Sequence, residues 1–181
     1  MNAVRPKMAV VGVGYVGMSI AALLARRNTV VALDVDPARV DKVNRRVSPV
    51  DDQDLSRYLA EEELDLRATV DPQEAFDGAE FAVVATPTDY DERTSSFDTA
   101  TVEEVLKVVA SDFPATVPVV KSTVPVGTAA RLQGVADWHA RDGVRAEVVW
   151  NPEFLREGKA LHDNLHPSRI VVGENSDRGR R

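Results

Sequence analysis

Residues 8–17 read Met8-Ala-Val-Val-Gly12-Val-Gly14-Tyr-Val-Gly17, where a short apolar run leads directly into three glycines spaced G-x-G-x-x-G. A strand, a glycine-rich turn and the start of a helix form the context in which this spacing predicts a dinucleotide site. Gly12 permits the tight turn, Gly14 lets the backbone approach a pyrophosphate, and Gly17 lets the helix pack closely on the strand. The helix N-terminus then offers unpaired N–H groups and a positive dipole end to the phosphates.

An acidic side chain stands where the ribose of a bound dinucleotide is expected. Asp34 ends the second apolar run, 17 residues after Gly17, and a carboxylate at this point accepts hydrogen bonds from ribose hydroxyls. Because a fixed negative charge there repels a 2′-phosphate, we expect NAD rather than NADP. Arg39, about one helical turn later, is interpreted as a cover over the adenine edge or the ribose, although a solvated charge on a helix face explains it nearly as well.

Apolar runs of strand length alternate with amphipathic helical stretches along the chain. The predicted strands are Met8–Val13, Val30–Asp34, a weaker Leu66–Val70, Phe81–Ala85, Val117–Ser122, Ala146–Trp150 and Arg169–Gly173. The predicted helices are Tyr15–Arg27, Pro37–Arg46 with Asp36 as N-cap, Asp54–Glu63, Val102–Ser111 and Thr128–Ala140, and Thr86–Thr99 is expected to be a surface loop. Continuous apolar strands are typical of a sheet covered on both faces, so we predict an α/β, Rossmann-like, doubly wound and mainly parallel sheet with helices on both faces.

Composition narrows the class of protein further. The chain has 181 residues, a formal net charge of −7, three histidines and no cysteine. The negative charge disfavours nucleic acid as a partner, and no apolar run approaches the roughly 20 residues of a membrane span. The absence of cysteine excludes disulfides and thiolate chemistry from these residues, and the histidines lack acidic partners at metal-ligand spacing, so no metal site is expected. We expect one domain over residues 1–181, in a cytoplasmic protein.

Three polar segments follow later predicted strands, at the sheet edge where ligands of α/β proteins bind. They are Ala85-Thr86-Pro-Thr88, Lys121-Ser-Thr123-Val-Pro-Val-Gly127 and Asn151-Pro-Glu153-Phe-Leu-Arg156-Glu157-Gly158. In the third segment, Pro152 is expected to open a helical turn that places Glu153 and Glu157 on one face. A solvated helix face accounts for two such carboxylates as well as a functional pair does. Lys121 and Lys159 are interpreted as structural.

Together these motifs resemble the nucleotide-sugar 6-dehydrogenases, and most closely the UDP-glucose branch of that family. The similarity runs from the glycine motif through Ala85–Asp91, Val120–Gly127 and Asn151–Gly158 to Pro167–Gly173. The Thr-Asp-Tyr-Asp loop and the Arg-Glu-Gly-Lys-Ala-Leu segment are more similar to the UDP-glucose branch than to the GDP-mannose or UDP-N-acetylmannosamine branches. The resemblance implies oxidation of the sugar C6 alcohol to a carboxylate with two NAD and one water, through aldehyde and cysteine-bound thioester stages.

The resemblance also implies roles for particular residues. NAD contacts fall on Gly12, Gly14, Tyr15, Val16, Gly17, Asp34, Arg39, Thr86, Thr88, Thr123 and Glu157. The sugar nucleotide is bordered by Glu153, Phe154, Leu155, Arg156 and Glu157. Hydrolysis of a thioester requires a held and deprotonated water, and the candidate catalytic residues are Thr123, Glu153 and Glu157. Thr123 is expected to hold this water and Glu153 to act as base, with Glu157 beside the nicotinamide, but the two glutamates could exchange roles.

The same resemblance implies parts that these 181 residues lack. In the family, the nucleophilic cysteine, an active-site lysine and its neighbouring asparagine lie in a central helix and a second, UDP-binding domain. The chain is expected to share a UDP-sugar substrate with that domain, to be inactive and monomeric alone, and to come from a homodimeric parent. Other interpretations stay open: a stand-alone NAD-binding module without catalysis, a GDP-mannose or UDP-N-acetylmannosamine dehydrogenase, or a Rossmann dehydrogenase acting on hydroxy acids or acyl thioesters.

Overall fold

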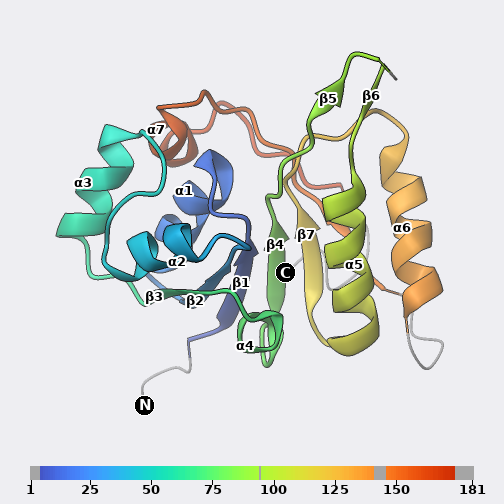
Figure 1. Cartoon of the computed structure of the whole chain (residues 1–181), viewed down its shortest axis with the longest axis horizontal. Coiled ribbons are helices and arrows are strands. Elements are labelled where there is room, and N and C mark those ends of the chain that lie inside the picture. Colours follow the sequence, from blue (N-terminus) through green and yellow to red (C-terminus); the bar gives the residue numbers. More distant parts are fainter. Residues whose placement is uncertain (1–4, 94, 141–145, 174–181) are drawn as a thin grey trace.

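A parallel sheet of six strands runs through the computed structural model, which describes residues 5–93, 95–140 and 146–173 (Figure 1). The strands are β1 (Lys7–Val11), β2 (Thr29–Leu33), β3 (Leu66–Thr69), β4 (Phe81–Val84), β7 (Val117–Val120) and β8 (Val149–Trp150). They lie in the order β3-β2-β1-β4-β7-β8, and every pairing is parallel. The direction of winding reverses between β1 and β4, and ligands of such sheets bind at the carboxyl ends beside this reversal.

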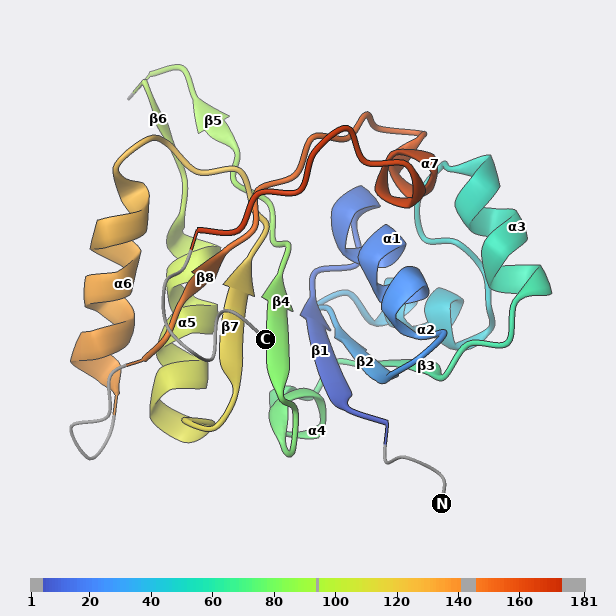
Figure 2. The ribbon, with the colours of Figure 1, turned by 180° about the vertical axis from the view of Figure 1, so that it is seen from behind.

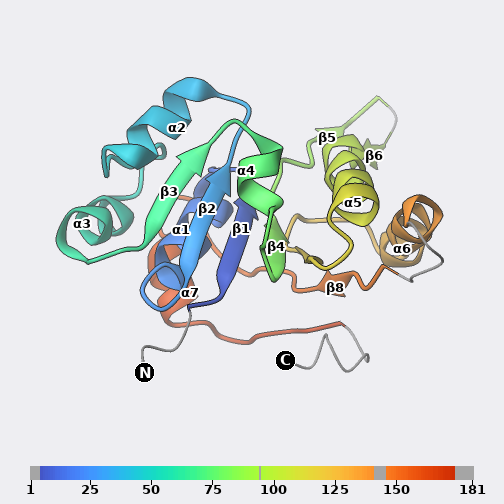
Figure 3. The same cartoon turned by 90° about the horizontal axis from the view of Figure 1, so that it is seen from below.

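Helices cover both faces of the sheet (Figures 2 and 3). They are α1 (Tyr15–Leu24), α2 (Pro37–Asn44), α3 (Gln53–Glu61), α4 (Pro72–Phe76), α5 (Ala100–Asp112), α6 (Thr128–His139) and α7 (Ala160–Leu165). Val10 belongs to an apolar cluster with α1, α3 and α7, whereas its neighbours Ala9 and Val11 belong to one with α4 and α5, as the alternation of side chains along a strand requires. The predicted doubly wound α/β fold is confirmed. Among the described helices, none has the length and apolar character needed to cross a bilayer.

Two glycines bring the start of α1 against the ends of β1 and β4. Gly12 has φ +91°, and a Cβ on it would lie 2.7 Å from the carbonyl oxygen of Ala85. A Cβ on Gly17 would lie 1.8 Å from the carbonyl oxygen of Gly12. Only glycine permits both the left-handed backbone and this close approach, so the motif fixes where the helix N-terminus stands relative to the sheet.

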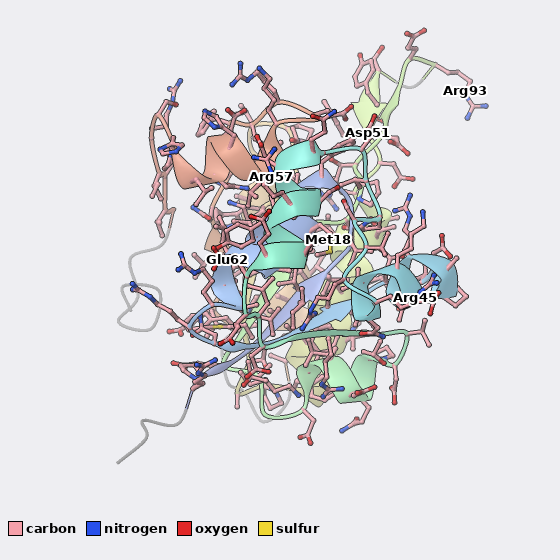
Figure 4. All side chains as sticks on the ribbon, turned by 90° about the vertical axis from the view of Figure 1, so that its left-hand side faces the viewer. Met18, Arg45, Asp51, Arg57, Glu62 and Arg93 are labelled. Carbon is pink, nitrogen blue, oxygen red and sulfur yellow. The ribbon has the colours of Figure 1, made fainter. Side chains whose placement is uncertain are left out.

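A buried carboxylate joins two helices on the α1 side of the sheet. Asp52 is 2% exposed; its Oδ1 accepts a hydrogen bond from the N–H of Leu55 at 3.0 Å, and its Oδ2 accepts one from the N–H of Leu161 at 3.3 Å. Asp52 therefore caps α3 and fastens α7 to it. Figure 4 shows this side of the molecule, with Arg57 at the surface of α3 and Met18 of α1 in the interior behind it.

The prediction of a strand over Arg169–Gly173 is wrong. A single antiparallel bridge joins Gly173 to Trp150, and the preceding residues form no strand. Ile170 and Val172 are 74% and 53% exposed, so this apolar run is not covered by helices as a sheet strand would be. An apolar pattern alone predicted burial that the tertiary structure does not provide.

The prediction of a helical turn after Pro152 is also wrong, because residues 151–156 form no helix. The N–H of Asn151 donates to the carbonyl oxygen of Val120 at 3.0 Å, and a residue that precedes proline is held extended. The chain therefore leaves β8 in an extended form. Glu153 and Glu157 share no helix face: Glu153 is half-buried, whereas Glu157 is exposed.

Several short elements were not predicted. They are α4, α7 and an antiparallel hairpin of β5 (Tyr90–Asp91) and β6 (Ser96–Phe97), which lies inside the predicted loop Thr86–Thr99. Each is too short for a periodic pattern of residues to reveal. The sixth strand of the sheet is shorter than predicted, because β8 contains only Val149–Trp150 of the expected Ala146–Trp150.

Substituting Gly17 tests the close contact at the start of α1. We expect Gly17→Ala to lower the free energy of unfolding by at least about 2 kcal/mol, because the obstructing atom belongs to the backbone and cannot rotate away. Gly134→Ala is the matched control, since a Cβ there meets no described atom within 4 Å and alanine improves the helix propensity of α6 by up to about 1 kcal/mol. Urea unfolding of the three proteins measures both effects, and equal midpoints for Gly17→Ala and the wild type would refute the contact.

Candidate functional site

A groove of about 390 Å³ opens at the carboxyl ends of β1, β2 and β4. Polar groups of Gly12, Asp34, Arg39 and Thr86 border it. Its walls are mainly apolar and include Leu33, Val35, Val70, Phe76, Val105 and Val108. A slot with mainly apolar walls and a few polar groups suits a flat heteroaromatic ring attached to a polar sugar.

Asp34 connects the end of β2 to the glycine turn. Its Oδ2 accepts a hydrogen bond from the N–H of Val13 at 2.8 Å, and its Oδ1 accepts one from the N–H of Asp36 at 2.9 Å. The residue is 9% exposed and borders the groove. Because each carboxylate oxygen can accept two hydrogen bonds, both oxygens keep capacity for a ribose hydroxyl. The aspartate thus shapes the turn and presents a negative charge to the groove.

The first turn of α1 begins shortly after Gly12, which borders the groove. Gly14 precedes the helix in an extended conformation, and within the described residues no side chain caps the helix. A Cβ on Gly14 would meet no described atom within 4 Å, so space lies open at this residue. Tyr15 and Val16 begin the helix and are half-buried. Uncapped amides, the positive end of the dipole and open space fit a pyrophosphate.

Arg39 lies at the rim of the groove on α2. Its Nε is 3.7 Å from Oδ2 of Asp36, and both side chains are about half exposed. Asp36 also caps the helix by accepting a hydrogen bond from the N–H of Ala38 at 2.8 Å, as predicted. The guanidinium therefore lies at the rim of the groove beside Asp36, and its contact with a dinucleotide stays a prediction.

The threonines that follow β4 and β7 connect these two strand ends. The hydroxyl of Thr88 donates to the carbonyl oxygen of Thr123 at 2.6 Å, and the hydroxyl of Thr101 on α5 donates to that of Thr86 at 3.2 Å. Thr86 borders the groove, whereas Thr123 is exposed on the loop before α6. The structure thus joins Thr88 to Thr123, and the predicted water-holding role of Thr123 stays a prediction.

A second, smaller cavity of about 140 Å³ lies between α1 and the segment that follows β8. Figure 2 shows this segment crossing to α7 and returning beside itself at the carboxyl edge of the sheet. Ile20 of α1, Lys121 at the end of β7, and Glu153 are part of the lining. Among the described residues, Oε2 of Glu153 is buried without a hydrogen-bond partner. Burial raises the pKa of this carboxyl to about 7, and the charge of Lys121 opposes the rise.

The structure places the residues predicted to border a sugar in two different environments. Glu153, Phe154 and Leu155 line the small cavity, whereas Arg156 and Glu157 are absent from its described lining. The guanidinium of Arg156 holds Asp163 through Nη2 to Oδ1 at 2.7 Å and Nε to Oδ2 at 3.0 Å, and this pairing lowers the pKa of Asp163 to about 2. Arg156 therefore connects the start of the loop before α7 to Asp163 within that helix.

The sequence favours a structural role for Lys121, and the structure places this residue in the lining of the smaller cavity. The residue is 6% exposed, and its Nζ donates to Oδ1 and O of Asn151 at 2.9 and 3.2 Å. A lysine directly after an apolar strand is the one sequence signal that indicated this position, since most lysines lie at the surface. No metal-binding group of three or more His, Cys, Asp or Glu side chains occurs in the described residues.

A glycine turn at a switch point, a carboxylate at the ribose position and an uncapped helix end define a dinucleotide-binding domain of the Rossmann class. Residues 6–181 match the UDP-glucose/GDP-mannose dehydrogenase family, NAD binding domain. The chain belongs to this family, and its cofactor is NAD.

Individual relatives agree with this assignment. The chain is 41% identical over 172 residues to UDP-glucose 6-dehydrogenase of Streptococcus pneumoniae, covering 94% of this chain and 42% of that enzyme. It is 39% identical to UDP-glucose 6-dehydrogenase of Campylobacter jejuni, covering 96% of this chain and 43% of that enzyme. A ternary complex of GDP-mannose dehydrogenase from Pseudomonas aeruginosa is similar with a TM-score of 0.85 and 26% identity, over 96% of this chain and 42% of that one. The chain thus spans less than half the length of these relatives.

The raised pKa of Glu153 predicts a dependence of stability on pH. A carboxyl whose pKa rises from 4.5 to about 7 on folding stabilises the fold fully below pH 4.5, and this contribution is lost as the pH rises through 7. Screening at a half-exposed group reduces the effect to about 1–2 kcal/mol. We expect Glu153→Gln to gain this amount relative to the wild type between pH 5 and pH 8, measured by guanidinium unfolding. Glu157→Gln is the exposed control, and parallel pH profiles for Glu153→Gln and the wild type would contradict the raised pKa.

Proposed function

We propose that these residues form the NAD-binding part of a UDP-glucose 6-dehydrogenase, in which the sugar C6 alcohol is oxidised to a carboxylate. The observation that carries the proposal is the half-buried Glu153, which lines a cavity at the same sheet edge as the dinucleotide turn. The 41% and 39% identity to enzymes named UDP-glucose 6-dehydrogenase supports UDP-glucose over other nucleotide sugars.

We assign the binding of NAD to three parts of the groove. The adenine ring fits between the apolar walls, the ribose hydroxyls bind Asp34, and the pyrophosphate binds the amides that follow Gly14 at the start of α1. Arg39, Thr86 and Thr88 border this path. When bound, NAD accepts two electrons and one proton of an alcohol oxidation as hydride, so oxidation of an alcohol to an acid consumes two NAD and one water.

Glu153 is assigned as the base that takes the proton from this water. A group whose pKa lies near the working pH accepts and releases a proton readily, and the pKa of Glu153 is raised to about 7. The residue lines a cavity that has room for water, and its Oε2 is buried without a hydrogen-bond partner among the described residues. Glu157 is exposed outside that cavity, which favours Glu153 between the two glutamates. Thr123 is assigned to hold the water.

The remaining catalytic parts are assigned to the portion of the relatives that this chain does not cover. The 181 residues contain no cysteine, so a thioester nucleophile has to come from elsewhere in the parent enzyme. We propose that residues 1–181 form a single domain that binds NAD as a monomer, and that the UDP end of the substrate binds a further domain of the parent. We propose that turnover requires both the NAD-binding domain and the further domain of the parent enzyme.

Asp34 is expected to select NAD over NADP. Asp34→Ala should weaken NAD binding by roughly 10- to 100-fold, the value of one or two hydrogen bonds to a charged acceptor, and should weaken NADP binding much less because the repulsion of the 2′-phosphate is also removed. Calorimetric titration of both dinucleotides measures the ratio of their dissociation constants. Asp36→Ala removes the cap of α2 but no ribose acceptor, and is the control. An equal loss for NAD and NADP in Asp34→Ala would contradict the ribose role.

Gly14 is expected to matter for binding and not for folding. Because the space above it is open, Gly14→Val should unfold within about 1 kcal/mol of the wild type, while its side chain occupies the path of the pyrophosphate and weakens NAD binding at least tenfold. Thermal unfolding and calorimetry separate the two effects. Unchanged NAD affinity in a folded Gly14→Val protein would place the pyrophosphate elsewhere.

A further inference from the structure

Lys121 occupies an unusual position for a lysine. It follows β7 directly, its N–H donates to the carbonyl oxygen of Val84 at 2.8 Å, and its side chain extends to Asn151 at the end of β8. Asn151 is itself fixed, because its Nδ2 donates to the carbonyl oxygen of Val171 at 2.8 Å. Both hydrogen-bond acceptors of Lys121 are uncharged, so neither neutralises the ammonium group.

Glu153 lines the same cavity as Lys121 and is the negative group that interacts with it. The two side chains interact electrostatically: Lys121 opposes the rise in the pKa of Glu153, and Glu153 opposes the fall in the pKa of Lys121 that burial causes. Each group therefore favours the charged form of the other. Both side chains line the same cavity, so the charge of this buried lysine acts on the carboxylate without a direct hydrogen bond.

Other charged groups around the cavity are engaged elsewhere. Asp163 of α7 is paired with Arg156 through three hydrogen bonds of 2.7 to 3.0 Å. The guanidinium of Arg169 lies over the ring of Phe154, 4.5 Å from its centre. From α1 the cavity receives Ile20, which is apolar. Lys121, at the end of a sheet strand, is thus the cation whose charge influences Glu153. Asn151 holds the side chain of Lys121 in place.

We propose that Lys121, anchored by Asn151, is the positioning residue of Glu153, and that its buried ammonium group favours the ionised carboxylate in the cavity. The inference rests on the role of Glu153 under the proposed function. Lys121 touches neither cofactor nor water in this scheme and acts through the glutamate. When Glu153 takes a proton, the ammonium loses its counter-charge, so the pair returns that proton readily.

The first test is a titration of the Glu153 carboxyl in the 181-residue chain, followed by carbon-13 NMR and assigned by the signal that Glu153→Gln removes. In the wild type the midpoint is expected near pH 7. Lys121→Met, which keeps the length of the side chain without its charge, should raise it by about one pH unit or more. Lys121→Arg should keep it close to the wild-type value, and Lys159→Met, at an exposed lysine of the same segment, should leave it unchanged. An unchanged midpoint in folded Lys121→Met overturns the proposal.

The second test needs no substitution of the lysine, in case Lys121→Met does not fold. Coupling between two titrating groups is reciprocal, so Glu153→Gln should lower the midpoint of Lys121, followed at its ε-carbon, by about as much as Lys121→Met raises that of Glu153. An unchanged lysine midpoint overturns the proposal. Neither test contains NAD or a sugar, so failure here leaves the proposed function standing, whereas failure of NAD binding leaves this charge coupling intact.

Discussion

The contact between Gly17 and the carbonyl oxygen of Gly12 is the constraint on which the rest of the site depends. A Cβ on Gly17 would lie 1.8 Å from that oxygen, so α1 approaches the end of β1 as closely as two backbones allow. This approach aims the uncapped end of the helix at the switch point between β1 and β4. Asp34 then fixes the turn from the side of β2 through the N–H of Val13. Asp34 and the uncapped end of α1 are therefore joined through the glycine turn.

Helix α1 also connects the dinucleotide groove to the cavity of Glu153. Ser19 is fully buried on α1; its hydroxyl donates to the carbonyl oxygen of Val16 at 2.9 Å and accepts a hydrogen bond from Nδ2 of Asn164 on α7 at 2.7 Å. Asp52 holds the other side of α7. The loop that carries Glu153 is thus fastened at its far end to α1, whose first turn is proposed to bind the cofactor. A chain of hydrogen bonds thus connects the loop of Glu153, the proposed base, to the helix that begins at the glycine turn.

Sequence reasoning predicted the parts of the fold and site that local patterns determine. The alternation of strands with helices, the glycine-rich turn and the N-cap at Asp36 each depend on patterns of a few neighbouring residues. The structure confirms these elements. The segment after β8 could not be predicted in this way. Its conformation follows from long-range contacts, above all the hydrogen bond from Asn151 to Val120 and the side chain of Lys121.

Glu153 and Glu157 are in different environments, and this separation has a chemical consequence. Two glutamates on one helix face would not have it. Two carboxylates on one exposed face would repel each other weakly and both remain ordinary acids in water. Here one carboxylate is drawn into a cavity where desolvation raises its pKa to about 7, while a buried ammonium limits the rise. Desolvation alone would keep the group protonated, and a full ion pair would make it a weak base. The balance between burial and Lys121 is what leaves Glu153 able to exchange a proton near neutrality.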